Sequence, residues 1–169
     1  MNKPYICRLL GIITLLIGGS MIMSLPWTIP IFGQVEKFDT RSFVALLGSM
    51  AVCAVLGGLL TYVGRKTGGQ RLFRKEAIAV VGLSWLLATV LGALPFWFSG
   101  TCRGVDAGGE AIQMDLFDGI FESASGFSGT GATVLTDLED PELVPRAVLF
   151  WRSETHFLGG LGIMVLFVA

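Results

Sequence analysis

The sequence has few charged residues, one histidine and only three cysteines. Asp, Glu, Lys and Arg make up 15% of its 169 residues, hydrophobic residues make up 53%, and the mean hydropathy is +0.71. This balance is typical of a membrane protein, not of a soluble one. His156 is the only histidine, which excludes a histidine metal cluster within this chain. The cysteines (Cys7, Cys53 and Cys102) lack metal-like spacing, so we interpret them as small apolar side chains and expect no disulfide or zinc framework.

Patterns that would indicate an enzyme or a nucleic-acid-binding protein are missing as well. No stretch is basic enough to bind nucleic acid. Gly126, Gly129 and Gly131 do not form a phosphate-binding loop, because the lysine of such a loop is missing and no predicted strand precedes it. We find no pairing of nucleophile and base and no cofactor loop. We therefore expect the protein not to be an enzyme and to use no enzymatic cofactor.

Three uncharged runs predict an all-α membrane protein. Residues 9–35, 42–64 and 77–102 carry no charge, and each exceeds the roughly 20 residues that cross a bilayer as a helix. The first run is longer than the apolar core of a signal peptide and no clean cleavage site follows it, so we interpret it as a retained helix. We expect this helix to end near Pro26 or Pro30, because proline disfavours continuation of a helix.

The basic residues predict the orientation in the membrane. The connection after the second run is rich in Lys and Arg, namely Arg65, Lys66, Arg71, Arg74 and Lys75. Short loops with this composition favour the cytoplasm. The amino terminus and the 65–75 loop are therefore expected on the cytoplasmic side, and the residues from Thr101 onward are expected to begin on the outer face.

Acidic residues are concentrated between residues 101 and 142, where Arg103 is the only basic one. The acids are Asp106, Glu110, Asp115, Asp118, Glu122, Asp137, Glu139, Asp140 and Glu142. A concave acidic mouth concentrates cations through its summed field. We predict a cation vestibule that includes Asp118, Glu122 and Asp137, with an ordinary solvated loop as the alternative.

Residues 117–133, FDGIFESASGFSGTGAT, are too short and too polar to span a membrane. Backbone that enters a bilayer without crossing it must be buried in protein or line water. A helix over 116–127 is about 18 Å long and would reach about halfway across the core. The small residues after it can turn their carbonyls toward an axis, as in an ion-selective pore. We predict a re-entrant pore loop in which Gly131 cannot be replaced, and a surface turn or linker remains the alternative.

A last apolar helix is predicted over 146–169, and its first turns carry charge. For Arg152 two interpretations remain open. It pairs with the pore-loop backbone or an acid such as Glu122, or it anchors the helix at the membrane interface. Glu154 and His156 are interpreted as interfacial or packing residues, not as a proton relay. Glycines that permit close helix approach follow them, namely Gly159, Gly160 and Gly162.

The stretches FESASGFSGTGATVL and LFWRSETHFLGGLGIMVL resemble the first pore loop and following helix of the Trk/Ktr/HKT superfamily of potassium transporters. The two helices ahead of this unit resemble the bacterial Trk type (TrkH-like) more than the Ktr type. The resemblance is specific in its motifs from about residue 117 to residue 169. It implies a fold like that of a potassium channel, in which a helix, a pore loop and a second helix repeat four times around one axis.

The resemblance also implies roles for individual segments. Residues 77–98 would be the outer helix, 116–127 the pore helix and 146–169 the inner helix. The filter segment, Ser128, Gly129, Thr130 and Gly131, would coordinate potassium through its backbone carbonyls, and Arg152 would support the pore. The family often reads Thr-Thr-Thr-Gly at the filter segment and Gln-Trp at the positions of His156 and Phe157, so this chain departs from it twice.

These expectations divide the chain into an amino-terminal two-helix hairpin (1–70) and one helix–pore loop–helix unit (71–169) whose last helix is incomplete. We expect the chain to be the amino-terminal part of a longer potassium uptake transporter in the bacterial inner membrane and not to conduct alone. The alternative is a non-conducting membrane interaction module or remnant. The resemblance implies as partners the remaining pore units, a second subunit in a homodimer and a cytoplasmic nucleotide-binding regulatory subunit.

Overall fold

The computed structural model describes residues 3–33, 37–65 and 74–168, and their secondary structure is mainly helical. The first part of the chain contains α1 (Lys3–Ser20), the 3-10 helix η1 (Met21–Thr28), α2 (Pro30–Gly33) and α3 (Thr40–Gly64). The second part contains α4 (Arg74–Gly92), α5 (Leu94–Ser99), strands β1 (Cys102–Val105) and β2 (Ala111–Gln113), α6 (Leu116–Ser128) and α7 (Arg146–Val168). The expected all-α class is confirmed, and the two short strands add to it.

Three helical segments are long and apolar enough to cross a membrane. They are Lys3–Thr28, Thr40–Gly64 and Lys75–Ser99, and each overlaps one of the three uncharged runs of the sequence. The first continues as η1 beyond Ser20 and ends at Thr28, between the two prolines expected to limit it. Pro26 lies inside η1, where its missing amide removes one backbone donor.

The third span is broken between α4 and α5. Pro95 occupies the first turn of α5 and cannot donate the hydrogen bond that a continuous helix requires. The indole Nε1 of Trp151 on α7 donates to the carbonyl of Gly92 at 2.9 Å. This contact satisfies a carbonyl at the break and fixes α7 against the junction of α4 and α5.

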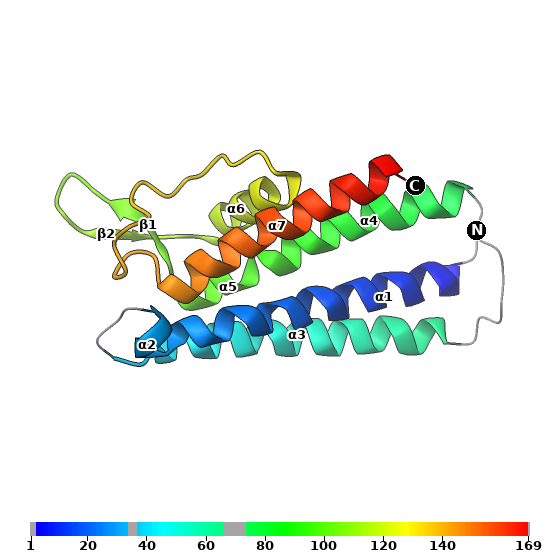
Figure 1. Ribbon diagram of the computed structural model, residues 1–169, viewed down its shortest axis with the longest axis horizontal. Helices are drawn as coiled ribbons and strands as arrows, with labels where there is room; N and C mark the ends of the chain where they lie inside the picture. The colour runs from blue at the N-terminus through cyan, green and yellow to red at the C-terminus, as the bar shows by residue number, and fades with distance from the viewer. Residues whose placement is uncertain (1–2, 34–36, 66–73, 169) are drawn as a thin grey trace.

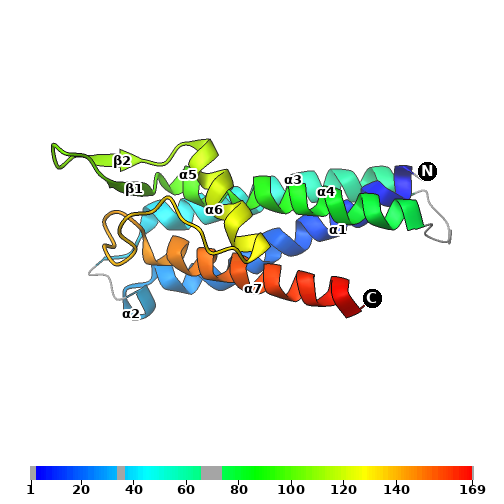
Figure 2. The ribbon, with the colours of Figure 1, turned by 90° about the horizontal axis from the view of Figure 1, so that it is seen from above.

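The helices lie along one long axis, and α6 enters the bundle without crossing it. Figures 1 and 2 place the β-hairpin, α2 and the start of α7 at one end, and the start of α1 and the ends of α3 and α7 at the other. α6 runs inward from the hairpin side and stops near the middle of the length, and the loop after it returns to the hairpin end. This is the path of a re-entrant segment.

The β-hairpin is an element that the sequence does not predict. β1 and β2 pair antiparallel with an irregularity between Cys102 and Gly104, and they are too short to show a clear alternation of polar and apolar residues. The hairpin also holds the loop that follows α6. The amide of Thr136 donates to the carbonyl of Arg103, and the amide of Cys102 donates to that of Leu143, both at 2.8 Å.

The amino-terminal helices pack directly on the pore unit. One apolar core includes Ile17 of α1, Leu46 of α3, Phe127 of α6 and Trp151 of α7. The boundary expected at residues 70 and 71 lies outside the described residues, as do Lys66 and Arg71 of the basic loop. The division into two parts therefore stays a prediction, and the two parts share one core.

Candidate functional site

α6 is a short helix with well-defined ends. Asp115 and Asp118 form a capping box, in which the Asp118 amide donates to Asp115 Oδ1 at 2.7 Å and the Asp115 amide donates to Asp118 Oδ2 at 3.2 Å. Gly129 ends the helix in the left-handed conformation with φ 69°. The helix has 13 residues, or about 20 Å, which is well short of a bilayer core of about 30 Å.

The filter segment leaves its carbonyl groups unpaired. The carbonyl oxygens of Ser128, Gly129, Thr130 and Gly131 accept no hydrogen bond from any residue that the structure describes. Residues 128–133 are all exposed. Ser128 is the last residue of α6 and Gly129 is its left-handed C-cap, so the first two residues of the filter segment belong to the end of the helix. Four consecutive free carbonyls at a helix end are suited to contact a cation.

Gly131 has a backbone conformation that other residues rarely adopt. Its φ is +75°, whereas a Cβ built on it would have no atom within 4 Å. Gly131 is expected to be irreplaceable, and the structure supplies one reason, its backbone conformation. A Cβ at this position would not clash with any residue that the structure describes.

Three contacts fold the segment after Gly131 back against α6. Ser125 Oγ donates to the carbonyl of Ala132 at 2.6 Å. Glu122 Oε1 accepts from the Thr133 hydroxyl at 2.5 Å and from the Val134 amide at 2.7 Å. Because Glu122 and Ser125 both belong to α6, the helix holds the residues directly after the filter segment as well as the start of this segment.

Glu122 is held on its other side by Arg152. Arg152 Nε donates to Glu122 Oε2 at 2.8 Å, and the exposed fractions of the two side chains are 14% and 0%. Of the alternatives left open for Arg152, pairing with Glu122 is the one observed. This is also a correction for Glu122: a carboxylate with no exposed surface, bound to Arg152 and the loop, does not line an open vestibule.

The two other acids expected in the vestibule lie nearer the surface. Asp118 faces Arg103 at 3.6 Å, in addition to capping α6. Asp137 is exposed and accepts from the amides of Glu139 and Asp140 at 2.9 and 3.3 Å. Asp118 lies in the first turn of α6 and Asp137 in the loop after this helix, and an acidic mouth made by these two residues stays a prediction.

The glycines of α7 differ in what they contact. A Cβ at Gly159 would collide with the backbone of Phe127, whereas a Cβ at Gly160 would have no atom within 4 Å. The end of α6 therefore rests on Gly159. Close approach is expected for the whole glycine cluster, but it is observed at Gly159 and not at Gly160.

We predict that Gly159→Ala lowers stability whereas Gly160→Ala does not. Gly159→Ala overpacks the contact with Phe127 and is expected to lower stability by about 1–3 kcal/mol. Gly160→Ala is expected to leave stability unchanged or raise it, since alanine favours a helix over glycine by about 1 kcal/mol. The melting temperatures of the purified variants in detergent measure both effects. Equal melting temperatures would contradict the packing of α6 on Gly159.

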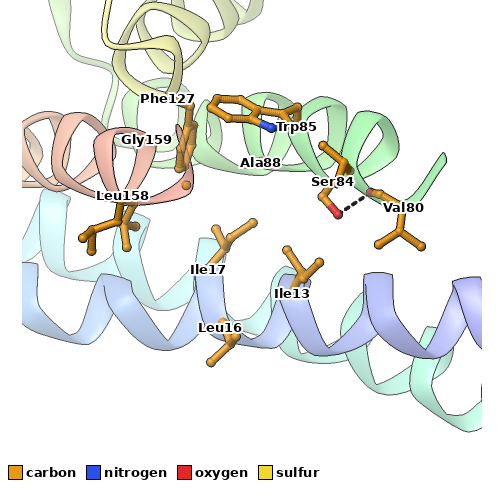
Figure 3. A pocket seen from close by; sticks show the side chains of 13 residues that line it. Ile13, Leu16, Ile17, Val80, Ser84, Trp85, Ala88, Phe127, Leu158 and Gly159 are labelled. Atoms are coloured by element: carbon orange, nitrogen blue, oxygen red, sulfur yellow. Dashed lines mark hydrogen bonds between the residues drawn. The ribbon is translucent and has the colours of Figure 1, made fainter. Parts of the chain in front are cut away.

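An apolar pocket of about 560 Å³ lies between α1, α4, α7 and the end of α6. Figure 3 shows Ile13, Ile17, Trp85, Phe127 and Leu158 around it. The hydroxyl of Ser84, which also lines it, donates to the carbonyl of Val80 at 2.6 Å. The lining is apolar apart from Ser84 and the indole N–H of Trp85, a donor that cannot coordinate a cation. Such a pocket does not replace the water around an ion, so the filter segment remains the candidate ion site.

Sequence reasoning missed the residues that hold the filter segment. Ser125 and Thr133 belong to a tract in which small polar residues are common, and neither differs from its neighbours in type. Their partners are seven and eleven residues away, which is not a helical or strand spacing. His156 Nδ1 lies 2.9 Å from the carbonyl of Arg152 on the same helix, consistent with the packing role expected for it.

Comparison with known proteins identifies the family. A family model described as "TrkH: Cation transport protein" matches residues 42–169. The Trk system potassium uptake protein TrkH of Escherichia coli K12 is 34% identical over 172 residues, which cover 100% of this chain and 31% of that protein. TrkG of the same strain is 29% identical over 150 residues, covering 89% of this chain and 27% of TrkG. This chain thus spans about a third of the length of these relatives. Because the family model covers well over half of it, the chain belongs to the TrkH family of cation transport proteins.

Proposed function

We propose that this chain is part of a potassium uptake transporter and supplies one of the four strands of its selectivity filter. The observation that carries this proposal is that the carbonyls of Ser128, Gly129, Thr130 and Gly131, all exposed residues, accept no hydrogen bond from the part of the chain that the structure describes. The names of the relatives support potassium as the permeant ion. The chain itself is expected to be a transporter component without an enzymatic cofactor.

The electrostatics of α6 favour a cation at its inner end. The last carbonyls of a helix carry a partial negative charge, and α6 ends near the middle of the long axis of the molecule. The filter carbonyls follow directly and would replace the hydration shell of the ion. Asp118 and Asp137 would raise the local cation concentration at the outer end of this path.

One pore unit supplies only one side of an ion cage. The family resemblance implies four units around one axis, and the exposed face of residues 128–133 would then meet the three others. Polar backbone of this kind facing lipid is unfavourable. We therefore expect no potassium flux from liposomes that contain this chain alone.

The membrane arrangement is proposed from charge and from the resemblance. The amino terminus and the basic loop would lie in the cytoplasm of a bacterial cell, and the hairpin end would lie outside the inner membrane. A second copy of the complete transporter and a cytoplasmic nucleotide-binding regulatory subunit would be the protein partners.

A complete transporter that carries this chain tests the proposal. In a chimaeric transporter, this chain replaces the matching segment of Escherichia coli TrkH, to which it aligns over its full length. The chimaeric transporter is expected to restore growth at low potassium, and rubidium uptake, to a strain without other potassium uptake systems. Intact Escherichia coli TrkH and an empty vector are the controls. A chimaeric transporter that reaches the membrane in normal amount but takes up no rubidium would instead favour a non-conducting interaction module.

A further inference from the structure

Two charged side chains near the start of α7 hold different parts of the molecule. Arg152 contacts Glu122 of α6, whereas Glu154 Oε2 accepts a hydrogen bond from the Ser24 hydroxyl of η1 at 2.6 Å. Residues two positions apart on a helix point about 200° from each other and do not share a face. α7 is therefore fixed by polar contacts on opposite sides, to the pore helix and to the amino-terminal hairpin.

The contact between η1 and α7 is buried and has a second component. The exposed fraction of Ser24 is 0% and that of Glu154 is 9%. One turn earlier on α7, Phe150 stacks on Trp27 of η1 with ring centroids 5.0 Å apart. A buried carboxylate needs polar partners, and among the described residues Ser24 is the side chain that donates to Glu154.

We propose that η1 braces the inner helix, and that Ser24 and Glu154 are positioning residues for the filter. Their hydrogen bond fixes the rotation of α7 about its axis, and this rotation sets the direction from which Arg152 reaches Glu122. Glu122 in turn holds Thr133 and Val134, next to the filter segment. The amino-terminal hairpin thereby acts on ion binding without touching an ion. This inference rests on the function proposed above.

The test compares two serines of the amino-terminal segment in the chimaeric transporter. Ser24→Ala removes the donor to Glu154, whereas Ser20→Ala removes a hydroxyl that bonds only to the carbonyl of Ile17 in its own segment. We expect Ser24→Ala to raise the KM for rubidium about fivefold, the effect of losing one buried hydrogen bond, and Ser20→Ala to leave it unchanged. KM does not depend on the amount of protein, so it separates a filter effect from poor folding, which lowers only the maximal rate.

Substitution of Glu154 gives the second measurement. Glu154→Gln keeps a carbonyl that accepts from Ser24 and is expected to retain a KM near that of the parent. Glu154→Leu removes the acceptor, and we expect its KM for rubidium to equal that of Ser24→Ala. The double variant Ser24→Ala, Glu154→Leu is expected to have the same KM as either single variant, since both substitutions remove the same contact. A KM for Ser24→Ala equal to that of Ser20→Ala overturns the brace, whatever the protein amounts. Uptake that persists in Gly131→Asp would instead show that the filter assignment itself is wrong.

Discussion

Gly131→Asp is expected to abolish potassium uptake by the chimaeric transporter. Gly131 has φ +75°. For a residue with a Cβ, this backbone conformation costs about 1–2 kcal/mol relative to a right-handed one. Relief of this strain would rotate the adjacent peptide units and turn the carbonyls of Thr130 and Gly131 away from the ion. The carboxylate would add a fixed charge beside the filter segment. Since a Cβ has free space at this position, we expect the loss to come from the filter and not from failure to fold.

Gly109→Asp is the matched control for this substitution. Gly109 has φ +83° and likewise no atom within 4 Å of a built Cβ, but it lies between β1 and β2, outside the filter segment. The same backbone strain is thus introduced at a position outside the proposed ion site. Growth at low potassium and initial rubidium uptake are the measurements. We expect normal values for Gly109→Asp, and unchanged growth of Gly131→Asp would rule out the filter assignment.

The parts of this fold that depend on the membrane could be predicted from the sequence. Lipid requires long uncharged helices, so the three uncharged runs predicted three spans, the second and third within three residues of their observed ends and the first within seven. The short helix expected over 116–127 is observed from Leu116 to Ser128, one residue longer than predicted.

The tertiary contacts of the site could be predicted only in part. Arg152 and Glu122 stood out because charges are rare in this chain, which made their pairing one of the alternatives. The partners of Glu122 in the loop, and the Ser24 hydroxyl 130 residues away from Glu154, belong to common residue types and follow no periodic pattern. The hairpin was missed because strands of four and three residues are shorter than the windows in which alternation is visible.

Arg152→Gln is expected to stop rubidium uptake and to lower the stability of the pore unit by about 3–5 kcal/mol. The substitution leaves Glu122, whose exposed fraction is 0%, as a buried carboxylate without its cationic partner. Such a group either takes up a proton or draws in water. Either change weakens its two hydrogen bonds to Thr133 and Val134, which hold the segment next to Gly131.

The double variant Glu122→Gln, Arg152→Gln separates the charge from the shape of this contact. A glutamine at position 122 carries no charge that needs a cationic partner, and its side-chain carbonyl can still accept hydrogen bonds from Thr133 and Val134. We therefore expect the double variant to be more stable and more active than Arg152→Gln alone. Arg103→Gln is the control, since Arg103 is 47% exposed and lies 3.6 Å from Asp118, a surface pair worth below about 1 kcal/mol. Melting temperature and rubidium uptake are measured for all variants. If Arg152→Gln behaves like Arg103→Gln, or if the double variant recovers nothing, the pair does not hold the filter segment through its charge.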